Sequence, residues 1–325
     1  MCKPGLSAMP EYLVTGGCGF IGSHLCDALI REGHRVRVLD DLSTGSMGNL
    51  SQGAMLFKGD IRDPEIVSAA MAGCDGCYHL AAVASVERSI REWLETHRIN
   101  LTGAIQIFDA ARRAGRNGQP IPVVYASSAA VYGDQGDATI AEDAPQRPTS
   151  AYGSDKLGCE HHARVAALVH GVPTTGLRFF NVYGPRQDPN SPYSGVISIF
   201  ANRMARNEPI KIFGDGRQTR DFVYVADVVR ALMLALKNIS LQPRVLNVCT
   251  GRSVSVKDLA VVIANRFGCR QRFEYLPCRE GEIRHSLGDP SATAKAIGFE
   301  AQTSLLDGLA RTIRAVTPEP AYAAK

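Results

Sequence analysis

A tyrosine and a lysine four residues apart, Tyr152 and Lys156, carry the most reactive chemistry that the sequence suggests. On a helix the two side chains share one face. The positive charge of the ammonium favours the phenolate and lowers a tyrosine pKa that is about 10 in water, so Tyr152 becomes a usable general base near neutral pH. The spacing alone is common, and when it stands alone a pair of solvated surface side chains is the better explanation.

A hydroxyl group is expected at the same place, because the apolar run Val123–Ala126 is followed by Ser127 and Ser128, 24 residues before Tyr152. If this run is a strand, Ser128 lies at its carboxyl end and donates a hydrogen bond to the oxygen that Tyr152 deprotonates. The alternative role of a serine, capping or turning the backbone, fits Ser127 better than Ser128. Serine hydrolase chemistry is not expected, since no G-x-S-x-G motif surrounds either residue.

Three glycines spaced as GxxGxxG follow the first predicted strand directly, and a helix is predicted after them. Gly16 and Gly19 permit a tight turn and let backbone N–H groups approach a pyrophosphate, while Gly22 lets the helix pack closely on the strand. Phe20 and Ile21 open this helix, whose positive end favours phosphate. A lone glycine triplet also occurs in ordinary strand-to-helix turns.

An acidic residue, Asp40, ends the second predicted strand, 18 residues past Gly22. There a carboxylate accepts hydrogen bonds from both hydroxyls of an adenosine ribose. Its charge repels a 2′-phosphate, and residues 41–43 supply no arginine to compensate. The sequence therefore predicts NAD rather than NADP as cofactor.

Further residues follow the third and fourth predicted strands, at the edge where open α/β sheets bind ligands. An acid can meet the adenine amino group, and small side chains leave room for the dinucleotide. The candidates are Asp60, Ile61, Leu80, Ala81 and Ala82. A surface acid and ordinary core packing explain the same residues equally well.

The chain alternates short β-branched runs with amphipathic stretches, which predicts a doubly wound, Rossmann-type parallel sheet with helices on both faces. The expected strands are Tyr12–Thr15, Arg35–Leu39, Met55–Lys58, Cys77–Ala81, Val123–Ala126, Thr175–Phe179 and Val245–Val248. The expected helices are Ile21–Glu32, Pro64–Met71, Trp93–Ala114, Ser154–His170 and Ala226–Lys237. Residues 1–180 are predicted to form the NAD-binding domain, to which residues 221–250 return, and residues 181–325 mainly form a smaller, discontinuous substrate-binding lobe.

The composition is that of an ordinary enzyme, with 325 residues, 45% hydrophobic residues, 21% charged residues and a net charge of +4. Basic residues form no stripe, so no nucleic-acid partner is expected. No apolar run approaches the roughly 20 residues of a membrane span, and the first ten residues lack a signal-peptide core, so a cytoplasmic location is expected. Cys18, Cys26 and Cys249 fall in apolar runs as free thiols, and Cys74 and Cys77 lack a second pair of ligands, so no metal is predicted.

Four motifs together resemble the extended short-chain dehydrogenase/reductases, over nearly the whole chain. They are the GxxGxxG turn, Ser128-Ala-Ala-Val-Tyr-Gly133, Tyr152-xxx-Lys156 and Arg178-Phe-Phe-Asn181-Val-Tyr-Gly-Pro. Within that superfamily the sequence is most similar to the UDP-glucose and UDP-N-acetylglucosamine 4-epimerases. The segments that carry this similarity are Arg186–Ile197 and Gly214–Asp221.

The resemblance implies a role for each matching residue. Ser128 and Tyr152 would meet the sugar O4, and Lys156 would hold the nicotinamide ribose. The UDP-sugar would further contact Ser85, Asn181, Val196, Lys211, Phe213, Arg220, Arg279, Glu282 and Ser286, with the two arginines on the diphosphate. Guanidinium groups suit phosphate oxygens well, although each arginine taken alone is equally explained as a surface charge.

Two positions refine the expected reaction. The related sugar 4,6-dehydratases carry an acid pair where this chain has Ala129 and Ala130, which cannot transfer a proton, so oxidation at C4 has no route to dehydration. Ser286 matches a position that lines the sugar pocket, where a bulky tyrosine is associated with exclusion of the acetamido group. A small serine predicts a pocket that admits N-acetylated sugars, although other walls of the pocket can decide this instead.

The resemblance thus implies NAD-dependent 4-epimerisation of UDP-hexoses, through a 4-keto sugar, by a homodimer. Leu94, Ile99, Ile105 and Phe108 fit either a dimer interface or an internal core. Two alternatives remain at this point. One is another nucleotide-sugar epimerase, such as a UDP-glucuronate 4-epimerase, and the other is a non-catalytic NAD-binding regulator, which the presence of Tyr152 and Lys156 disfavours.

Overall fold

A parallel sheet of seven strands forms the larger part of the molecule in the computed structural model, which describes residues 9–188, 195–268, 272–278 and 283–316. The strands lie in the order β10-β6-β5-β4-β1-β2-β3, and the order reverses between β1 and β4, as in doubly wound folds. This confirms the predicted Rossmann-type class. The strand bounds are β1 Glu11–Thr15, β2 Arg35–Asp40, β3 Met55–Lys58, β4 Gly76–His79, β5 Val123–Ser128, β6 Thr174–Phe179 and β10 Arg244–Val248.

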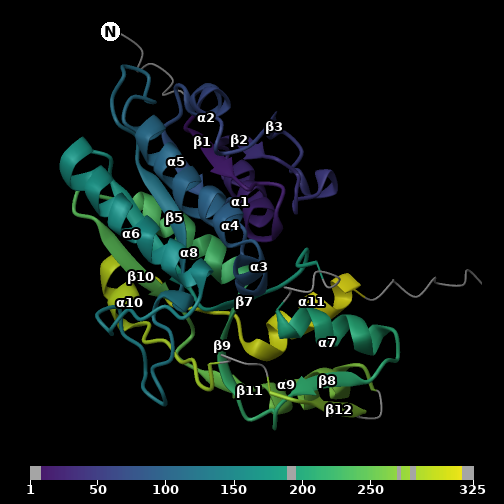
Figure 1. Cartoon of the computed structure of the whole chain (residues 1–325). Helices are drawn as coiled ribbons and strands as arrows, with labels where there is room; N and C mark the ends of the chain where they lie inside the picture. The colour runs from purple at the N-terminus through teal and green to yellow at the C-terminus, as the bar shows by residue number, and fades with distance from the viewer. Residues whose placement is uncertain (1–8, 189–194, 269–271, 279–282, 317–325) are drawn as a thin grey trace, which may run out of the picture.

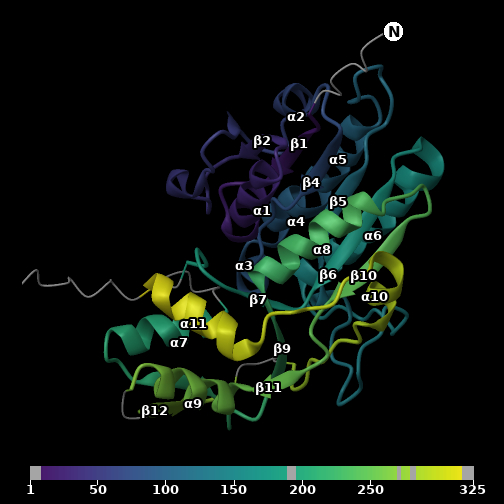
Figure 2. The same cartoon turned by 180° about the vertical axis from the view of Figure 1, so that it is seen from behind.

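Helices cover both faces of this sheet (Figures 1 and 2). One face packs on α1 (Phe20–Arg31) and α8 (Val225–Lys237). The other packs on α2 (Pro64–Met71), α5 (Gly103–Ala111) and α6 (Ala151–His170). Because both faces are covered, the central strands β1, β4, β5 and β6 have no exposed residue.

The helix predicted over Trp93–Ala114 is interrupted. The structure has α4 (Trp93–His97), a π-helical turn at Arg98–Thr102, and then α5, which ends at Ala111. A short helix that the sequence analysis did not predict, α3 (Val86–Arg91), precedes α4. Several other predicted ends differ by one to three residues; for example, β4 stops at His79 and α6 begins three residues before Ser154.

The smaller lobe follows β6 and holds two small sheets with their helices (Figure 1). Its core is formed by the elements β7 Asn181–Tyr183, α7 Val196–Ala205, β8 Ile210–Phe213, β9 Thr219–Tyr224, β11 Ser253–Ser255, α9 Val256–Arg266, β12 Phe273–Leu276 and α11 Leu305–Val316. The remaining helix, α10 (Ser291–Ile297), packs against β10. The chain therefore enters this lobe, returns to the large sheet through α8 and β10, and enters it again. The exact domain limits remain a proposal.

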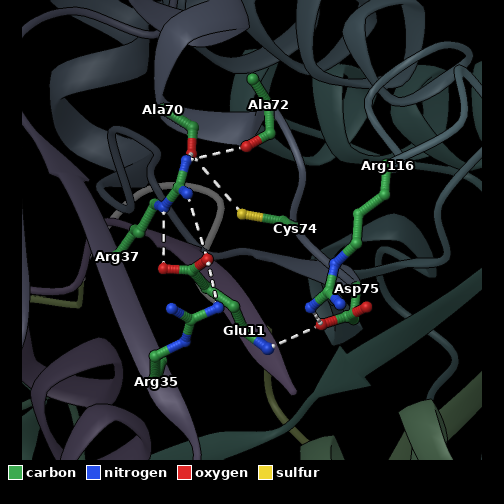
Figure 3. Close-up of polar contacts among 8 residues, drawn as sticks. All are labelled: Glu11, Arg35, Arg37, Ala70, Ala72, Cys74, Asp75 and Arg116. Atoms are coloured by element: carbon green, nitrogen blue, oxygen red, sulfur yellow. Dashed lines mark hydrogen bonds and ion pairs between the residues drawn. The ribbon is translucent and has the colours of Figure 1, made fainter. Parts of the chain in front are cut away.

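A buried carboxylate, that of Glu11, fixes the amino ends of β1 and β2 (Figure 3). The glycine turn follows the other end of β1. Glu11 accepts two hydrogen bonds from Arg37, at 3.0 and 3.1 Å. Arg37 also donates to the carbonyl oxygens of Ala70 and Ala72, while the N–H of Glu11 donates to Asp75 at 2.8 Å. These bonds join β1, β2 and the end of α2. They fix the position of one strand relative to the other, and so also the relative position of the strand ends that carry the glycine turn and Asp40.

The described cysteines are free, and Cys18, Cys26 and Cys249 are fully buried in apolar surroundings, as predicted. Burial raises the pKa of Cys18 to about 11. Among the described residues, no group of three or more side chains is placed to hold a metal ion. No helix in the described part of the chain is long and apolar enough to cross a membrane.

Candidate active site

The glycine turn, residues 16–22, is packed so closely that its glycines have little or no space for a side chain. Gly16 has a φ of +71°, a conformation that favours glycine. A Cβ atom on Gly22 would lie 2.1 Å from the carbonyl oxygen of Gly16, and one on Gly17 would lie 2.6 Å from Val38. Helix α1 therefore begins directly against the turn. Gly19 is its N-cap and has no side chain to cover the first N–H groups, which suits a pyrophosphate.

Asp40 lies at the end of β2 beside this turn and is 6% exposed. Its carboxylate accepts hydrogen bonds from the N–H groups of Cys18, at 2.9 Å, and Leu42, at 2.8 Å. Each oxygen thus uses one acceptor position and keeps another for a ribose hydroxyl. The turn and this carboxylate together fit the adenosine and diphosphate parts of NAD.

The predicted adenine contacts have protein partners of their own. Asp60 forms an ion pair with Arg62 at 2.6 Å, and hydrogen bonds from Arg62 lower the pKa of the carboxyl group. Arg62 also binds Glu95. Ile61 is 5% exposed and packs in the core between the sheet and α5. A direct contact of either residue with the cofactor stays a prediction.

A threonine that the sequence analysis did not single out shapes the segment after β4. The Thr15 hydroxyl oxygen accepts from the N–H groups of Leu80 and Ala81, both at 3.2 Å. Its own proton is then directed to Nδ1 of His79, at 2.8 Å. Because these bonds turn the chain at His79, the residues Leu80–Ala82 lie in a loop and not in the strand. The N–H of Ala81 lies against Gly16, where a Cβ atom would come within 2.9 Å of it.

His79 should make stability depend on pH. Burial, together with the charge of Lys156, lowers the pKa of His79 to about 3. The unfolded chain, with a histidine pKa of about 6.5, takes up a proton below that pH that the folded protein does not, so stability is full above pH 6.5 and falls towards pH 3. Between pH 7.5 and 5.5 the parent should lose about 1 kcal/mol more unfolding free energy than His79→Gln does, measured by urea denaturation. Equal losses would contradict this assignment.

The predicted base and its ammonium lie in the first two turns of α6. Ser150 caps this helix by accepting from the N–H of Gly153 at 3.1 Å, and Ser89 on α3 accepts from the N–H of Tyr152 at 3.2 Å. The Lys156 ammonium is 5.9 Å from the centre of the Tyr152 ring and donates to the carbonyl oxygen of Ala126 at 2.9 Å. Lys156 is 4% exposed, so solvent screens its charge little.

The roles expected of the two serines were partly wrong. Ser128 is the residue that caps, since its oxygen accepts from the N–H of Ala130 at 3.1 Å and begins the 3-10 turn Ala129–Val131. This bond uses the oxygen only, so the hydroxyl proton remains available to a substrate. Ser127 is buried and donates to Glu160 at 2.5 Å. That contact spans 33 residues, which local sequence rules do not reveal.

Glycine also lets the two segments that carry the predicted catalytic residues touch. A Cβ atom on Gly153 would lie 2.6 Å from the carbonyl oxygen of Ala130. The turn after Ser128 and the first turn of α6 are therefore in direct contact, backbone to backbone. This contact brings the segments of Ser128 and Tyr152 together at the carboxyl edge of β5.

Most of the predicted substrate residues lie in the smaller lobe. Asn181 begins β7, Val196 begins α7, Lys211 and Phe213 lie on β8, and Arg220 lies on β9. Ser286 lies between His285, which bonds Thr219, and Leu287, whose carbonyl accepts from Ile140. Ser85 differs, since it caps α3 in the large domain by accepting from Arg88 at 2.9 Å. Arg279 and Glu282 lie outside the described residues, and the substrate contacts of this set stay predictions.

Besides Thr15, three polar residues support the site without having been predicted. Ser89 holds the N–H of Tyr152, as described above. Asn100, in the π-helical turn, bonds both backbone groups of Val83 at 2.8 and 3.1 Å and so fixes the loop after β4. Asp155, between Tyr152 and Lys156 in sequence, bonds His97 at 2.8 Å, and burial raises its pKa. Of these three, only Asp155 could have been noticed in the sequence, because it is an acidic residue within the Tyr–Lys motif.

This fold and this site define an enzyme of the Rossmann class that uses a nicotinamide dinucleotide. Residues 12–249 match the model of the NAD dependent epimerase/dehydratase family. The chain belongs to this family, and its cofactor is NAD.

Individual relatives resemble the chain over almost its whole length. The UDP-glucose 4-epimerase of Mycolicibacterium smegmatis is 36% identical, over 93% of this chain and 96% of the relative. The solved structure of UDP-glucose 4-epimerase from Thermotoga maritima with UDP-glucose superimposes with a TM-score of 0.89 at 36% identity, covering 94% of this chain and 98% of that one. A UDP-N-acetylglucosamine 4-epimerase from Methanobrevibacter ruminantium M1, in complex with UDP-N-acetylmuramic acid, gives 0.88 at 34% identity, with the same coverage.

Proposed function

We propose that this protein interconverts the C4 epimers of UDP-hexoses, UDP-glucose with UDP-galactose and UDP-N-acetylglucosamine with UDP-N-acetylgalactosamine. The observation that carries the proposal is the contact between the turn after Ser128 and the helix of Tyr152 and Lys156, at the sheet edge beside the glycine turn. The similarity to 4-epimerases of both substrate types supports it.

In this mechanism Tyr152 removes the proton of the 4-hydroxyl while Lys156 stabilises the phenolate. Ser128 donates a hydrogen bond to the same oxygen, which becomes the carbonyl of a 4-keto sugar. Bound NAD supplies a reversible hydride acceptor, so the sugar undergoes no net oxidation. The sugar turns over while the diphosphate stays held, so that C4 presents its opposite face to the cofactor, and Tyr152 then returns the proton to O4.

The turn after Ser128 limits the reaction to epimerisation. Ala129 and Ala130 form this turn, and the N–H of Ala130 is bonded to Ser128. Neither side chain can accept or donate a proton, so the 4-keto sugar meets no acid or base there that would promote loss of water.

Three substrates test the proposal. Purified protein is incubated without added NAD with UDP-glucose, UDP-N-acetylglucosamine or UDP-glucuronate, and the products are identified by NMR. Formation of UDP-galactose and UDP-N-acetylgalactosamine is expected. Conversion of UDP-glucuronate alone would assign a different epimerase, and conversion of none would refute the proposal.

The breadth of the sugar pocket is assigned to Ser286, which is half-buried beside the contact between Ile140 and Leu287. Replacing it with tyrosine adds a ring where the acetamido group is expected to lie. Ser286→Tyr should lower kcat/KM for UDP-N-acetylglucosamine at least ~10-fold more than for UDP-glucose, a plausible size for one steric contact. Steady-state kinetics with both substrates measures this, and equal losses would assign specificity to other walls.

We also propose a homodimer in the cytoplasm. Large apolar side chains are exposed on the neighbouring helices α3, α4 and α6, namely Val86, Ile90, Trp93, Leu94, Val165, Leu168 and Val169. A second copy would cover them as a bundle of helices. Of the residues that left the choice open, Phe108 belongs to the core, whereas Leu94 is 63% exposed and remains available to a partner.

If the protein is a dimer, one charged side chain introduced into this interface should dissociate it into monomers. Leu168→Asp on α6 should convert a dimer into a monomer, whereas Leu241→Asp, at an equally exposed site on the loop before β10, should not. Sedimentation of both variants and the parent measures this. If the parent protein is a monomer, the proposed dimer is refuted. If the Leu168→Asp variant remains a dimer, the interface lies elsewhere.

A further inference from the structure

A buried ion pair links helix α6, which carries Tyr152 and Lys156, to the end of β5, which carries Ser128. Glu160 lies on α6 one turn after Lys156, and Arg178 lies on β6. The guanidinium donates to both carboxylate oxygens, at 2.8 and 2.7 Å, and the side chains are 4% and 6% exposed. Desolvation makes such a pair a weak source of stability compared with an apolar pair, so its contacts in the core are better examined for a geometric role.

Glu160 and Arg178 form hydrogen bonds with residues on both sides of Ser128 in the sequence. Ser127, the preceding residue, donates to Glu160 at 2.5 Å. Tyr132, four residues after Ser128, accepts from Arg178 at 2.8 Å, and its ring centre lies 4.7 Å from the guanidinium carbon. The end of β5 and the turn that follows it are thus both tied to the helix that carries Tyr152 and Lys156.

The contacts continue into the sheet and leave the pair little freedom to shift. The Tyr132 hydroxyl donates to Asn247 on β10 at 2.7 Å. Arg178 also donates to the carbonyl oxygen of Glu142 at 2.8 Å, and the carboxylate of Glu142 accepts from the N–H of Asn247 at 2.8 Å. A network satisfied in this way specifies one arrangement of its elements.

We propose that Glu160 and Arg178 are positioning residues, which act through Ser127 and Tyr132 to hold the Ser128 hydroxyl in place relative to Tyr152 and Lys156. This inference deepens the proposed 4-epimerase function and rests on it. None of these four residues needs to touch substrate. Their effect arises because catalysis depends steeply on how the reacting groups are placed.

Ser127→Ala tests the inference with the least disturbance, because it removes one hydroxyl and no charge. We expect kcat for UDP-glucose to fall ~10-fold while KM stays within about twofold, since substrate binding is left intact and only alignment is lost. Ser127→Thr, which keeps the hydroxyl, should restore most of the activity.

Thr174→Val is the matched control. Thr174 is equally buried, lies on β6, and donates to the α6 backbone at Ala163, at 3.0 Å, away from Ser128. This variant also removes a single buried hydrogen bond between the sheet and α6. It should lower the melting temperature about as much as Ser127→Ala does and leave kcat within about twofold of the parent.

A double-mutant cycle tests whether Ser127 affects catalysis by positioning Ser128. In a Ser128→Ala background, the further change Ser127→Ala should lower kcat by less than about twofold, because the group that it aligns is gone. An undiminished ~10-fold loss in that background, or equal kcat for Ser127→Ala and Thr174→Val, would overturn the inference. An inactive parent enzyme would instead refute the proposed function.

Discussion

Tyr152→Phe is expected to lower kcat for UDP-glucose ~10³-fold, because general-base catalysis contributes about 10²- to 10⁴-fold. No described residue forms a hydrogen bond with the Tyr152 hydroxyl, although its backbone N–H is bound by Ser89. The substitution therefore leaves no partner unsatisfied, and the melting temperature and the bound NAD should be unchanged. Measurement of kcat, of melting temperature and of cofactor content separates loss of the base from loss of the fold.

A surface phenol provides the control for this experiment. Tyr275 on β12 is 51% exposed, and Tyr275→Phe should leave kcat within about twofold of the parent. If Tyr152→Phe retained activity within a few-fold of the parent, Tyr152 would not be the base.

Gly22→Ala is expected to remove bound NAD. The new methyl group would lie 2.1 Å from the carbonyl oxygen of Gly16 and 2.9 Å from Cα of Gly17, and backbone cannot rotate away as a side chain can. Helix α1 must therefore move off the turn, which withdraws its first N–H groups from the diphosphate. Overpacking of this kind costs about 1–3 kcal/mol of stability, and affinity for NAD should fall at least ~100-fold when α1 no longer faces the phosphates.

Two other glycines make this result interpretable. Gly48→Ala should change neither property, because the nearest atom to its Cβ is 3.5 Å away. Gly19→Ala should fold and show an intermediate loss of NAD, since its Cβ would lie 3.2 Å from the Gly16 oxygen. Calorimetric titration with NAD measures affinity, and full binding by Gly22→Ala would contradict the assigned cofactor site.

The features that the sequence predicted are those that depend on short stretches of chain. The glycine turn, the acid that ends β2 and the Tyr–Lys pair each lie within one strand, turn or helix, where residue type and spacing suffice. The alternation of strands and helices likewise gave the sheet class. The fit of Asp40 to a ribose follows from the same local geometry.

The features that were missed depend on partners far along the chain. Ser127 and Ser128 have the same side chain, and it is the contact with Glu160, 33 residues away, that commits Ser127 to the core. Apolar spacing predicts one helix across residues 93–114, but Asn100 binds the backbone of Val83, which accompanies a π-helical turn. Ser89 meets Tyr152 across 63 residues. Folding sets such contacts, and no local pattern in the sequence reports them.

The fate of the hydrogen at C4 tests the central claim most directly. UDP-glucose carrying deuterium at C4 is incubated with the protein in ordinary water, and the UDP-galactose formed is analysed by NMR and mass spectrometry. If Tyr152, Lys156 and Ser128 promote oxidation and reduction at this carbon, the deuterium remains at C4 of the product and turnover is slowed by the heavier isotope. Replacement of the deuterium by hydrogen from water would show that the carbon is deprotonated instead, and would contradict the account.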